Sequence, residues 1–331
     1  MEAYSYNGGF EPFETYNRRK TYEKKELHML GSRTGVCVCA YIILANLLPI
    51  LLMSDRFLEL YEKNGTFFYS YNILITLLTL FLPFFLMGRS TEKKLPVQVD
   101  MIPAGKPNRL SLLLLAVPAG FAGCLLANTI NSYITLIIES AGVKLTAPDL
   151  EPATMTQNIP MYLLFVAVCS PLCEEIIMRG IVLQPLRKYS DAFAVGVSAV
   201  VFGLMHCNLI QAPFAVLGGI VLGFFAVSTG SLWTGILIHA CNNLFAVFVE
   251  EIGKGLSDGE FAALYTLLMR VILLVGAVCL VFFCLIKRKV HTDRRDTVLT
   301  TGEKAKAFFL NIPMAAALIF VAIMTREYIL L

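Results

Sequence analysis

Residues 110–138 read LSLLLLAVPAGFAGCLLANTINSYITLII and contain no charged side chain. A helix needs roughly 20 predominantly apolar residues to cross the hydrocarbon core of a bilayer, so this run is long enough to span one. Eight other runs are nearly free of charge: 35–53, 67–87, 159–172, 192–205, 213–229, 232–249, 261–286 and 307–325. Those beginning at 159, 192 and 213 are short, and could span only if tilted, extended by polar helix or shielded by neighbours. The pattern predicts an all-α, polytopic transmembrane helical bundle of about eight or nine spans.

The composition also indicates a membrane protein. Of the 331 residues, 57% are hydrophobic and 15% are charged, and the mean hydropathy is +0.69. A soluble domain rarely sustains this imbalance, because it needs polar side chains to cover its surface. The first 30 residues lack the basic, apolar and small-residue order of a cleavable signal peptide, so we expect the first span to act as an uncleaved insertion signal.

The distribution of Lys and Arg predicts the orientation in the membrane. If the N-terminus is cytoplasmic and nine spans alternate, the inner segments hold 21 of these residues and the outer segments hold 5. Cytoplasmic loops of membrane proteins are enriched in Lys and Arg. The inner segments are 1–34, 88–109, 179–191 and 287–306. We therefore expect a cytoplasmic N-terminus, in the plasma membrane of a prokaryote or the endoplasmic reticulum of a eukaryote, and no nucleic-acid site in the basic runs.

The chain divides into four sections. Residues 1–34 form a charged cytoplasmic extension, and residues 35–138 contribute three spans. Residues 155–250 hold nearly every unusual polar residue, and residues 261–331 add two further spans. The nine cysteines lie in or beside apolar runs, where we expect them to act as small hydrophobic side chains rather than as a disulfide framework.

Few ionisable side chains lie deep within the apolar runs. At the centre of a membrane helix such a group costs roughly 2.5–3.5 kcal/mol on insertion scales, and it persists where a cavity or partner stabilises it. Away from helix ends the set is Glu174, Glu175, His206, His239 and Arg270. All but the last fall within residues 155–250, so we expect the functional core of the protein there.

The first polar motif is CEEIIMR at residues 173–179. Glu175 and Arg179 are four residues apart, so they share a helix face and can form an ion pair. Glu174 is rotated by about 100° from Glu175, which leaves its carboxylate for a partner elsewhere. Taken alone, the motif also fits two carboxylates that mark a helix end beside a basic loop.

Two further polar motifs follow. Phe202 and His206 share one helix face, and His239 and Asn243 share another, because the members of each pair are four residues apart. Each pair also fits a structural role. His206 could be a core histidine bonded to a neighbouring carbonyl, and His239 and Asn243 could form hydrogen bonds between membrane helices. A histidine within a membrane helix nevertheless favours a functional role.

The spacing of the motifs predicts that they meet. The polar stretch 187–191 is the expected turn between two antiparallel helices, and Glu174 and His206 each lie 16 residues from Ser190. At 1.5 Å per residue, both side chains would lie about 24 Å from that turn. His239 reaches a similar depth if the turn protrudes into the cytosol. Glu174, His206, His239 and Asn243 can therefore converge.

These motifs resemble, in the same order, those of the CAAX protease and bacteriocin-processing family (CPBP, or Abi), which includes the type II CAAX prenyl endopeptidases. They read Glu174-Glu175-x-x-x-Arg179, Phe202-x-x-x-His206 and His239-x-x-x-Asn243. The resemblance covers residues 155–250 and implies an intramembrane endopeptidase. Its expected substrate is a membrane-associated or prenylated protein, cleaved near its C-terminus, or a leader peptide.

The resemblance also implies roles for individual residues. Glu174 would be the general base that activates water, with His206 as its partner. His239 and Asn243 would stabilise the oxyanion. Arg179 would order Glu175 and the helix end. The expected partners are membrane lipid and a peptide or membrane-protein substrate.

A metal-dependent mechanism is the alternative within this family, whose members have often been labelled metallopeptidases. Glu174, His206 and His239 are a ligand set that could hold Zn²⁺ with water in the fourth position. The HExxH helix of soluble zinc proteases is absent from the sequence, and Asn243 is a poor zinc ligand. We therefore expect water activation without a metal, with Zn²⁺ as the alternative cofactor.

Two other classes of protein compete with the peptidase. Intramembrane Glu and His side chains can relay protons, so an ion-coupled transporter is one alternative. No pair of corresponding Gly- or Pro-broken segments indicates the repeated halves of a transporter. A non-catalytic immunity or scaffold protein is the other, although the intact set of polar residues argues against a decayed site.

Overall fold

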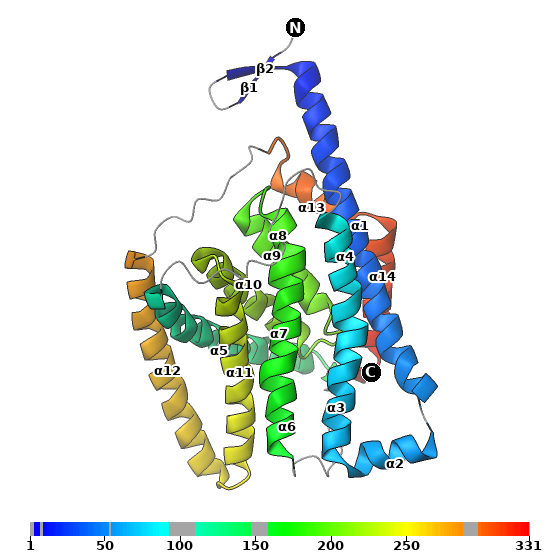
Figure 1. The fold of residues 1–331 in the computed structure, drawn as a ribbon. Helices are drawn as coiled ribbons and strands as arrows, with labels where there is room; N and C mark the ends of the chain where they lie inside the picture. Colours follow the sequence, from blue (N-terminus) through cyan, green and yellow to red (C-terminus); the bar gives the residue numbers. More distant parts are fainter. Residues whose placement is uncertain are drawn as a thin grey trace.

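The computed structural model describes residues 3–6, 9–52, 54–92, 110–146, 158–286 and 297–330, which form a helical bundle (Figure 1). The helices are α1 (Phe13–Leu52), α2 (Asp55–Lys63), α3 (Gly65–Ile75), α4 (Leu82–Glu92), α5 (Leu110–Ser140), α6 (Ile159–Leu163), α7 (Ser170–Glu175), α8 (Leu183–Leu186), α9 (Asp191–Leu204), α10 (Ala212–Thr229), α11 (Leu232–Gly253), α12 (Asp258–Ile286), α13 (Thr301–Phe309) and α14 (Ile312–Arg326). Three π-helical segments continue the helices at Thr76–Phe81, Leu164–Cys169 and Ile176–Val182. Two antiparallel strand pairs complete the structure: β1 (Ala3–Tyr6) with β2 (Gly9–Pro12), and β3 (Lys144–Leu145) with β4 (Ile329–Leu330).

The predicted all-α, polytopic membrane architecture is confirmed. Within the described residues, seven continuous helices are long and apolar enough to cross a membrane. They are Phe13–Leu52, Gly65–Thr91, Leu110–Ser140, Ile159–Leu186, Ala212–Thr229, Leu232–Gly253 and Asp258–Ile286. α13 and α14, which are bent by 75° relative to each other, would together make an eighth span. The chain is therefore an integral membrane protein.

A ninth span, which the apolar run 192–205 suggested, is not formed. That run folds as α9, whose 14 residues make it about 21 Å long at 1.5 Å per residue. The hydrocarbon core is about 30 Å thick, so α9 is too short to cross it. Helix α9 instead packs against α10 inside the bundle. The chain reverses between these two helices within residues 205–211.

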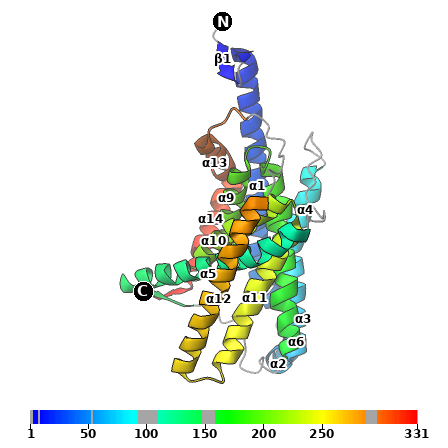
Figure 2. The ribbon, with the colours of Figure 1, turned by 90° about the vertical axis from the view of Figure 1, so that its left-hand side faces the viewer.

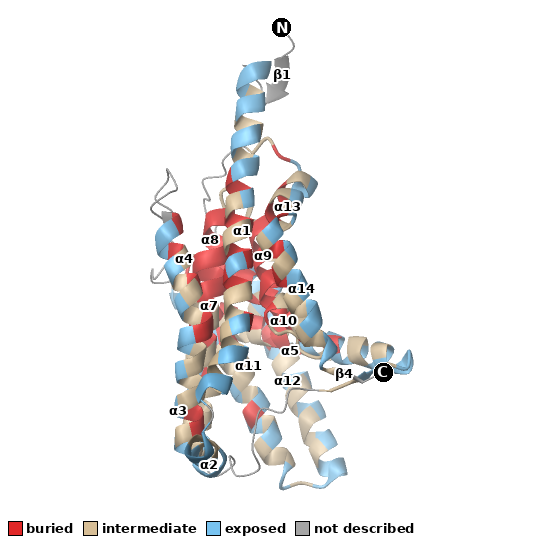
Figure 3. Ribbon diagram, turned by 90° about the vertical axis from the view of Figure 1, so that its right-hand side faces the viewer, coloured by how far each residue is buried: buried red, intermediate tan, exposed pale blue. Residues whose placement is uncertain are grey.

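Most of the long helices run side by side along one axis, and α5 lies across them at a steep angle (Figures 1 and 2). α5 packs against α10, α11 and α12, and so connects the helices of the second half of the bundle. Buried residues concentrate around α7, α8, α9 and α10 (Figure 3). The predicted functional section, residues 155–250, therefore supplies the most enclosed part of the described structure.

The predicted N-terminal extension is largely helical. Residues 13–34 are the first half of α1, which continues without a break into the first span. Buried Glu26 forms an ion pair with Lys188 and accepts a hydrogen bond of 2.8 Å from the hydroxyl of Tyr189. Burial and the Glu26 carboxylate raise the pKa of Tyr189, so the phenol stays protonated and continues to donate. These contacts hold α1 against the turn before α9.

Three predicted segments lie outside the described residues. They are parts of the basic loops, residues 93–109 and 287–296, and residues 147–157, which include the first residues of the core section.

The close contact between α1 and α14 depends on a glycine in α1. A Cβ atom added at Gly35 would lie 2.5 Å from the backbone nitrogen of Met314 and 2.6 Å from the carbonyl carbon of Pro313. Backbone atoms cannot move aside as a flexible side chain can. Any larger residue at position 35 would therefore force α14 away from α1.

We expect Gly35→Ala to lower the thermal stability of the protein, because overpacking against backbone costs about 1–3 kcal/mol. Gly196→Ala in α9 is the matched control, since a Cβ at Gly196 would meet no atom within 4 Å. Alanine favours a helix over glycine by about 1 kcal/mol, so the control should be unchanged or more stable. Unfolding of the detergent-solubilised protein measures both. Equal stability of the two variants would contradict this account of the α1–α14 contact.

Candidate active site

Glu174 and Glu175 lie at the C-terminal end of α7, between two π-helical segments. A π-helical segment adds one residue to a turn and occurs frequently at functional sites, because it changes which side chains face a given direction. The whole stretch Ile159–Leu186 nevertheless forms one candidate span. Both carboxylates are therefore fixed on a rigid helix within the bundle.

Glu175 forms the predicted ion pair with Arg179. The Nη1 atom of Arg179 lies 2.8 Å from Oε1 of Glu175, and the two side chains are 1% and 0% exposed. Nη2 of Arg179 donates a hydrogen bond of 3.1 Å to the carbonyl oxygen of Gly219 in α10. The guanidinium also lies over the ring of Phe202, 5.0 Å from its centroid. Arg179 thus connects three helices of the core.

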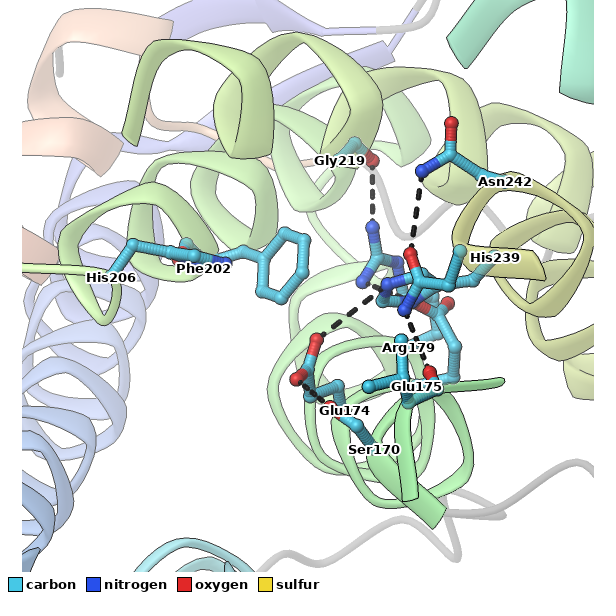
Figure 4. A network of polar contacts seen from close by, with 11 residues as sticks. Ser170, Glu174, Glu175, Arg179, Phe202, His206, Gly219, His239 and Asn242 are labelled. Atoms are coloured by element: carbon cyan, nitrogen blue, oxygen red, sulfur yellow. Dashed lines mark hydrogen bonds and ion pairs between the residues drawn. The ribbon is translucent and has the colours of Figure 1, made fainter. Parts of the chain in front are cut away.

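His239 of α11 lies between the two carboxylates (Figure 4). Its Nδ1 atom is 3.0 Å from Oε1 of Glu175, and its Nε2 atom is 3.7 Å from Oε2 of Glu174. An ionised carboxylate only accepts hydrogen bonds, so Nδ1 of His239 carries a hydrogen that it donates to Glu175. Glu175 therefore orients the imidazole, and the ring directs Nε2 towards Glu174.

Glu174 keeps access to open space. Oε1 of Glu174 accepts a hydrogen bond of 2.6 Å from the hydroxyl of Ser170. The carboxylate lines a cavity of about 260 Å³. The residues around it are Tyr41, Leu80, Glu174, Met178, Phe202, Met205, His206 and Gln211. Glu174 has one side-chain hydrogen bond, from Ser170, and is therefore less constrained than Glu175. The cavity beside it makes the carboxylate accessible to a small molecule such as water.

His206 lines the same cavity from the opposite wall, just beyond the last residue of α9. Its Nδ1 atom is 2.8 Å from the carbonyl oxygen of Phe202. A carbonyl oxygen can only accept, so Nδ1 of His206 carries the hydrogen and Nε2 is an unprotonated acceptor in the neutral ring. Glu174 and His206 thus line one cavity.

The turn that carries His206 is held by Asn208, which the sequence did not single out. Asn208 is 1% exposed, and its Nδ2 donates to the carbonyl of His206 at 2.7 Å and to Oε1 of Gln211 at 2.9 Å. Oδ1 of Asn208 accepts from the backbone N–H of Gln211 at 2.8 Å. Cys207 has a φ of +51°, a left-handed conformation that costs energy for a residue with a Cβ. Asn208 therefore stabilises a strained turn away from water.

The predicted convergence of the four polar residues is only partly present. The ring of Phe202 stands edge-on to both histidines, with its centroid 4.9 Å from that of His206 and 5.9 Å from that of His239. Nδ2 of Asn243 donates a hydrogen bond of 2.9 Å to the carbonyl oxygen of Val166. Its Oδ1 accepts from Asn242 at 3.3 Å. Asn243 therefore fastens α11 to the helix of Val166, with one amide hydrogen still uncommitted.

The alternative zinc ligand set does not fit this arrangement. Among the described residues, no group of three or more His, Cys, Asp or Glu side chains is arranged to hold a metal ion. Glu174 approaches Nε2 of His239, but Phe202 lies between the rings of His239 and His206. The nine cysteines are all free, and none joins a metal-binding cluster.

Together, the fold and the site define a class of protein: a polytopic helical membrane protein in which Glu174 and His206 line one cavity, with Glu175 and His239 in contact beside it. Residues 156–245 match the family described as type II CAAX prenyl endopeptidase, Rce1-like. This match contains all three motifs that the sequence analysis singled out. Residues 156–245 are therefore similar to this family, and the predicted resemblance is confirmed.

Two bacterial proteins are also similar. YdiL of Bacillus subtilis (strain 168), named as a candidate membrane peptidase, is 25% identical over 155 residues, which cover 46% of this chain and 63% of YdiL. The membrane-embedded CAAX protease MroQ of Staphylococcus aureus (strain USA300) is 24% identical over 143 residues, which cover 40% of this chain and 58% of MroQ. The matched region thus spans less than two thirds of either relative. No solved structure matches the chain.

Arg179→Met should destabilise the protein strongly, because it leaves the Glu175 carboxylate buried without a cation. Breaking a buried ion pair by removing one partner typically costs about 3–5 kcal/mol. Lys63→Met is the matched control, since the pair of Lys63 with Glu59 is 71% and 64% exposed and such pairs contribute at most about 1 kcal/mol. Chemical unfolding in detergent compares the two. Similar unfolding midpoints would show that the Glu175–Arg179 pair does not stabilise the core.

Proposed function

We propose that the protein is an intramembrane endopeptidase that hydrolyses a peptide bond in a membrane-associated protein or peptide. The main support is the cavity in which the Glu174 carboxylate and the Nε2 atom of His206 face the same open volume. Glu174 can accept a proton and Nε2 of His206 can accept a hydrogen bond, and the cavity that both residues line has room for water. This is the arrangement that activation of a water molecule requires.

In the proposed reaction, Glu174 removes a proton from water while Nε2 of His206 accepts a hydrogen bond from the same water. The oxygen adds to the carbonyl carbon of the scissile bond and forms a tetrahedral intermediate. Glu174 then gives its proton to the leaving amine as the C–N bond breaks. General acid–base catalysis of this kind contributes roughly 10²–10⁴-fold to the rate.

The charges around His239 support its role as an electrophilic group. With Glu174 and Glu175 ionised and Arg179 protonated, the three side chains carry one net negative charge. A His239 ring with a hydrogen on both nitrogens has a donor directed at each carboxylate. The Nε2–H of His239 could then donate to the oxyanion, and the second amide hydrogen of Asn243 is the other proposed donor.

The proposed substrate is a polypeptide segment that reaches the site from the bilayer. Much of the cavity wall is apolar, supplied by Leu80, Met178, Phe202 and Met205. Such a wall favours an apolar side chain beside the scissile bond, where burial contributes about 25 cal/mol per Å². The family description and the name of MroQ favour a CAAX-type protein tail. A leader peptide remains the other substrate class within the same proposal.

We further propose that the N-terminal end of α1 and the turn 187–190 face the cytoplasm. Lys188 of that turn and Lys304 of α13 meet at this end of the bundle, around Glu26 and the carbonyl of Tyr189. Clusters of Lys and Arg beside membrane helices are retained on the cytoplasmic side. Membrane lipid would then surround the apolar faces of the long helices.

Glu174→Gln and His206→Ala should each abolish cleavage, because glutamine cannot accept a proton and alanine cannot bind the water. Comparative proteomics of membrane-protein termini, wild type against each variant, measures this even while the substrate is unidentified. Glu139→Gln and His28→Ala, both at exposed positions, are the matched controls. Termini that are unchanged in the Glu174→Gln strain would contradict the peptidase. Ion-coupled uptake that depends on Glu174 would favour a transporter instead.

Removal of metal ions should leave cleavage unchanged, because the described residues form no three-ligand site. The purified protein is treated with a chelator, dialysed and assayed on a peptide taken from the identified cleavage site. Loss of activity that is restored by Zn²⁺ but not by Mg²⁺ would show that Glu174, His206 and His239 rearrange around a metal. Unchanged activity supports direct water activation.

A further inference from the structure

Tyr41 of α1 enters the proposed active-site cavity from outside the family-matched region. It lines the cavity together with Glu174 and His206, although it lies more than 100 residues before the start of the match at residue 156. Its ring packs against the main hydrophobic cluster of the core. Tyr41 therefore faces the reacting groups from a fixed position.

The hydroxyl of Tyr41 has no hydrogen-bond partner among the described residues. Tyr41 is half-buried and lines the cavity, so its hydroxyl is able to donate to a molecule bound there. The other neutral polar side chain of the cavity, Gln211, is engaged through Oε1 and its backbone N–H by Asn208. Among the described residues, the hydroxyl of Tyr41 and the Nε2 amide of Gln211 are thus cavity donors without a protein acceptor, and Tyr41 is the one on α1.

The groups assigned to the oxyanion are, by contrast, largely committed. One amide hydrogen of Asn243 is taken by the carbonyl of Val166, and both nitrogens of His239 face carboxylates. A carbonyl oxygen that becomes negative when water adds needs donors that are already in place, since a preorganised donor costs no rearrangement during the reaction. The cavity therefore requires a further donor, and Tyr41 has the right chemistry.

We infer that the Tyr41 hydroxyl is a catalytic hydrogen-bond donor to the carbonyl oxygen of the scissile peptide bond. This inference rests on the proposed peptidase function and adds a residue to it from the first span. The phenol donates its hydrogen to that oxygen and keeps it, so no proton is transferred. The bond strengthens as negative charge develops in the tetrahedral intermediate and weakens when the C–N bond breaks. The side chain thus favours the transition state over the bound substrate.

The test is Tyr41→Phe, which removes the hydroxyl and keeps the ring that packs against the core. The full-length protein is assayed in detergent with a quenched fluorescent peptide built on the cleavage site found by comparison with Glu174→Gln. We expect kcat to fall by about 10²–10³-fold, the usual effect of losing one oxyanion donor, with KM nearly unchanged. Tyr71→Phe is the matched control, because the Tyr71 hydroxyl is buried in α3 without a partner and outside the cavity.

The outcomes separate this inference from the proposed function. Cleavage that needs Glu174 but proceeds at the wild-type rate in Tyr41→Phe overturns the role of Tyr41 and leaves the peptidase intact. A raised KM at unchanged kcat also overturns it, because the hydroxyl would then bind only the ground state. Cleavage that survives Glu174→Gln overturns the proposed function and the role of Tyr41 with it. Equal unfolding midpoints for wild type and Tyr41→Phe confirm that a lowered kcat is not a folding defect.

Discussion

The core depends on one buried ion pair, between Glu175 and Arg179. Two charges without exposure to solvent are costly unless each finds its full set of partners. Arg179 bonds Glu175 and the Gly219 carbonyl, and Glu175 bonds Arg179 and Nδ1 of His239, which leaves Nε of Arg179 and Oε2 of Glu175 without a partner among the described residues. The pair therefore fixes the relative positions of the α7 region, α10 and α11, and with them the direction of the His239 ring.

The approach of α11 to this pair sets a strict limit on side-chain size. A Cβ atom at Gly235 would lie 2.6 Å from Oε2 of Glu175. Oε2 of Glu175 has no hydrogen-bond partner among the described residues. The space between the helices holds the carboxylate but has no room for a methyl group beside it. Gly235 and His239 are one turn apart on the same face of α11. Gly235 thus leaves space for the Glu175 carboxylate, and His239 donates a hydrogen bond to it.

The second constraint is the bilayer, which explains why nine apolar runs do not give nine spans. A chain can reverse inside a membrane protein only where the backbone polar groups of the turn are satisfied by the protein. Asn208 does this between α9 and α10, and Asn131 adds a bond of 2.8 Å from α5 to the carbonyl of Ile210. Hydropathy alone contains no information on such a turn, because α9 is as apolar as a true span.

Local spacing predicted the parts of the site that one helix determines. The four-residue separation of Glu175 and Arg179 predicted their pair, and the equal distances of Glu174 and His206 from the turn predicted their shared cavity. Contacts between distant segments could not be predicted in this way. Tyr41 is one of many residues in an apolar run, and nothing in its neighbours in the sequence indicates that α1 reaches the cavity. The bond of Asn243 to Val166 likewise depends on how two helices meet.

The structure also explains how two adjacent glutamates acquire different chemistry. Glu175 is surrounded by Arg179 and His239, which stabilise its charge and leave it little freedom to exchange a proton. Glu174 has one bond from a neutral hydroxyl and an open cavity beside it. The first carboxylate is held in place on several sides, whereas the second can be reached from the cavity. The helical rotation of about 100° between neighbours is enough to place them in these two environments. Glu175 is therefore suited to orient His239, and Glu174 to act on the water.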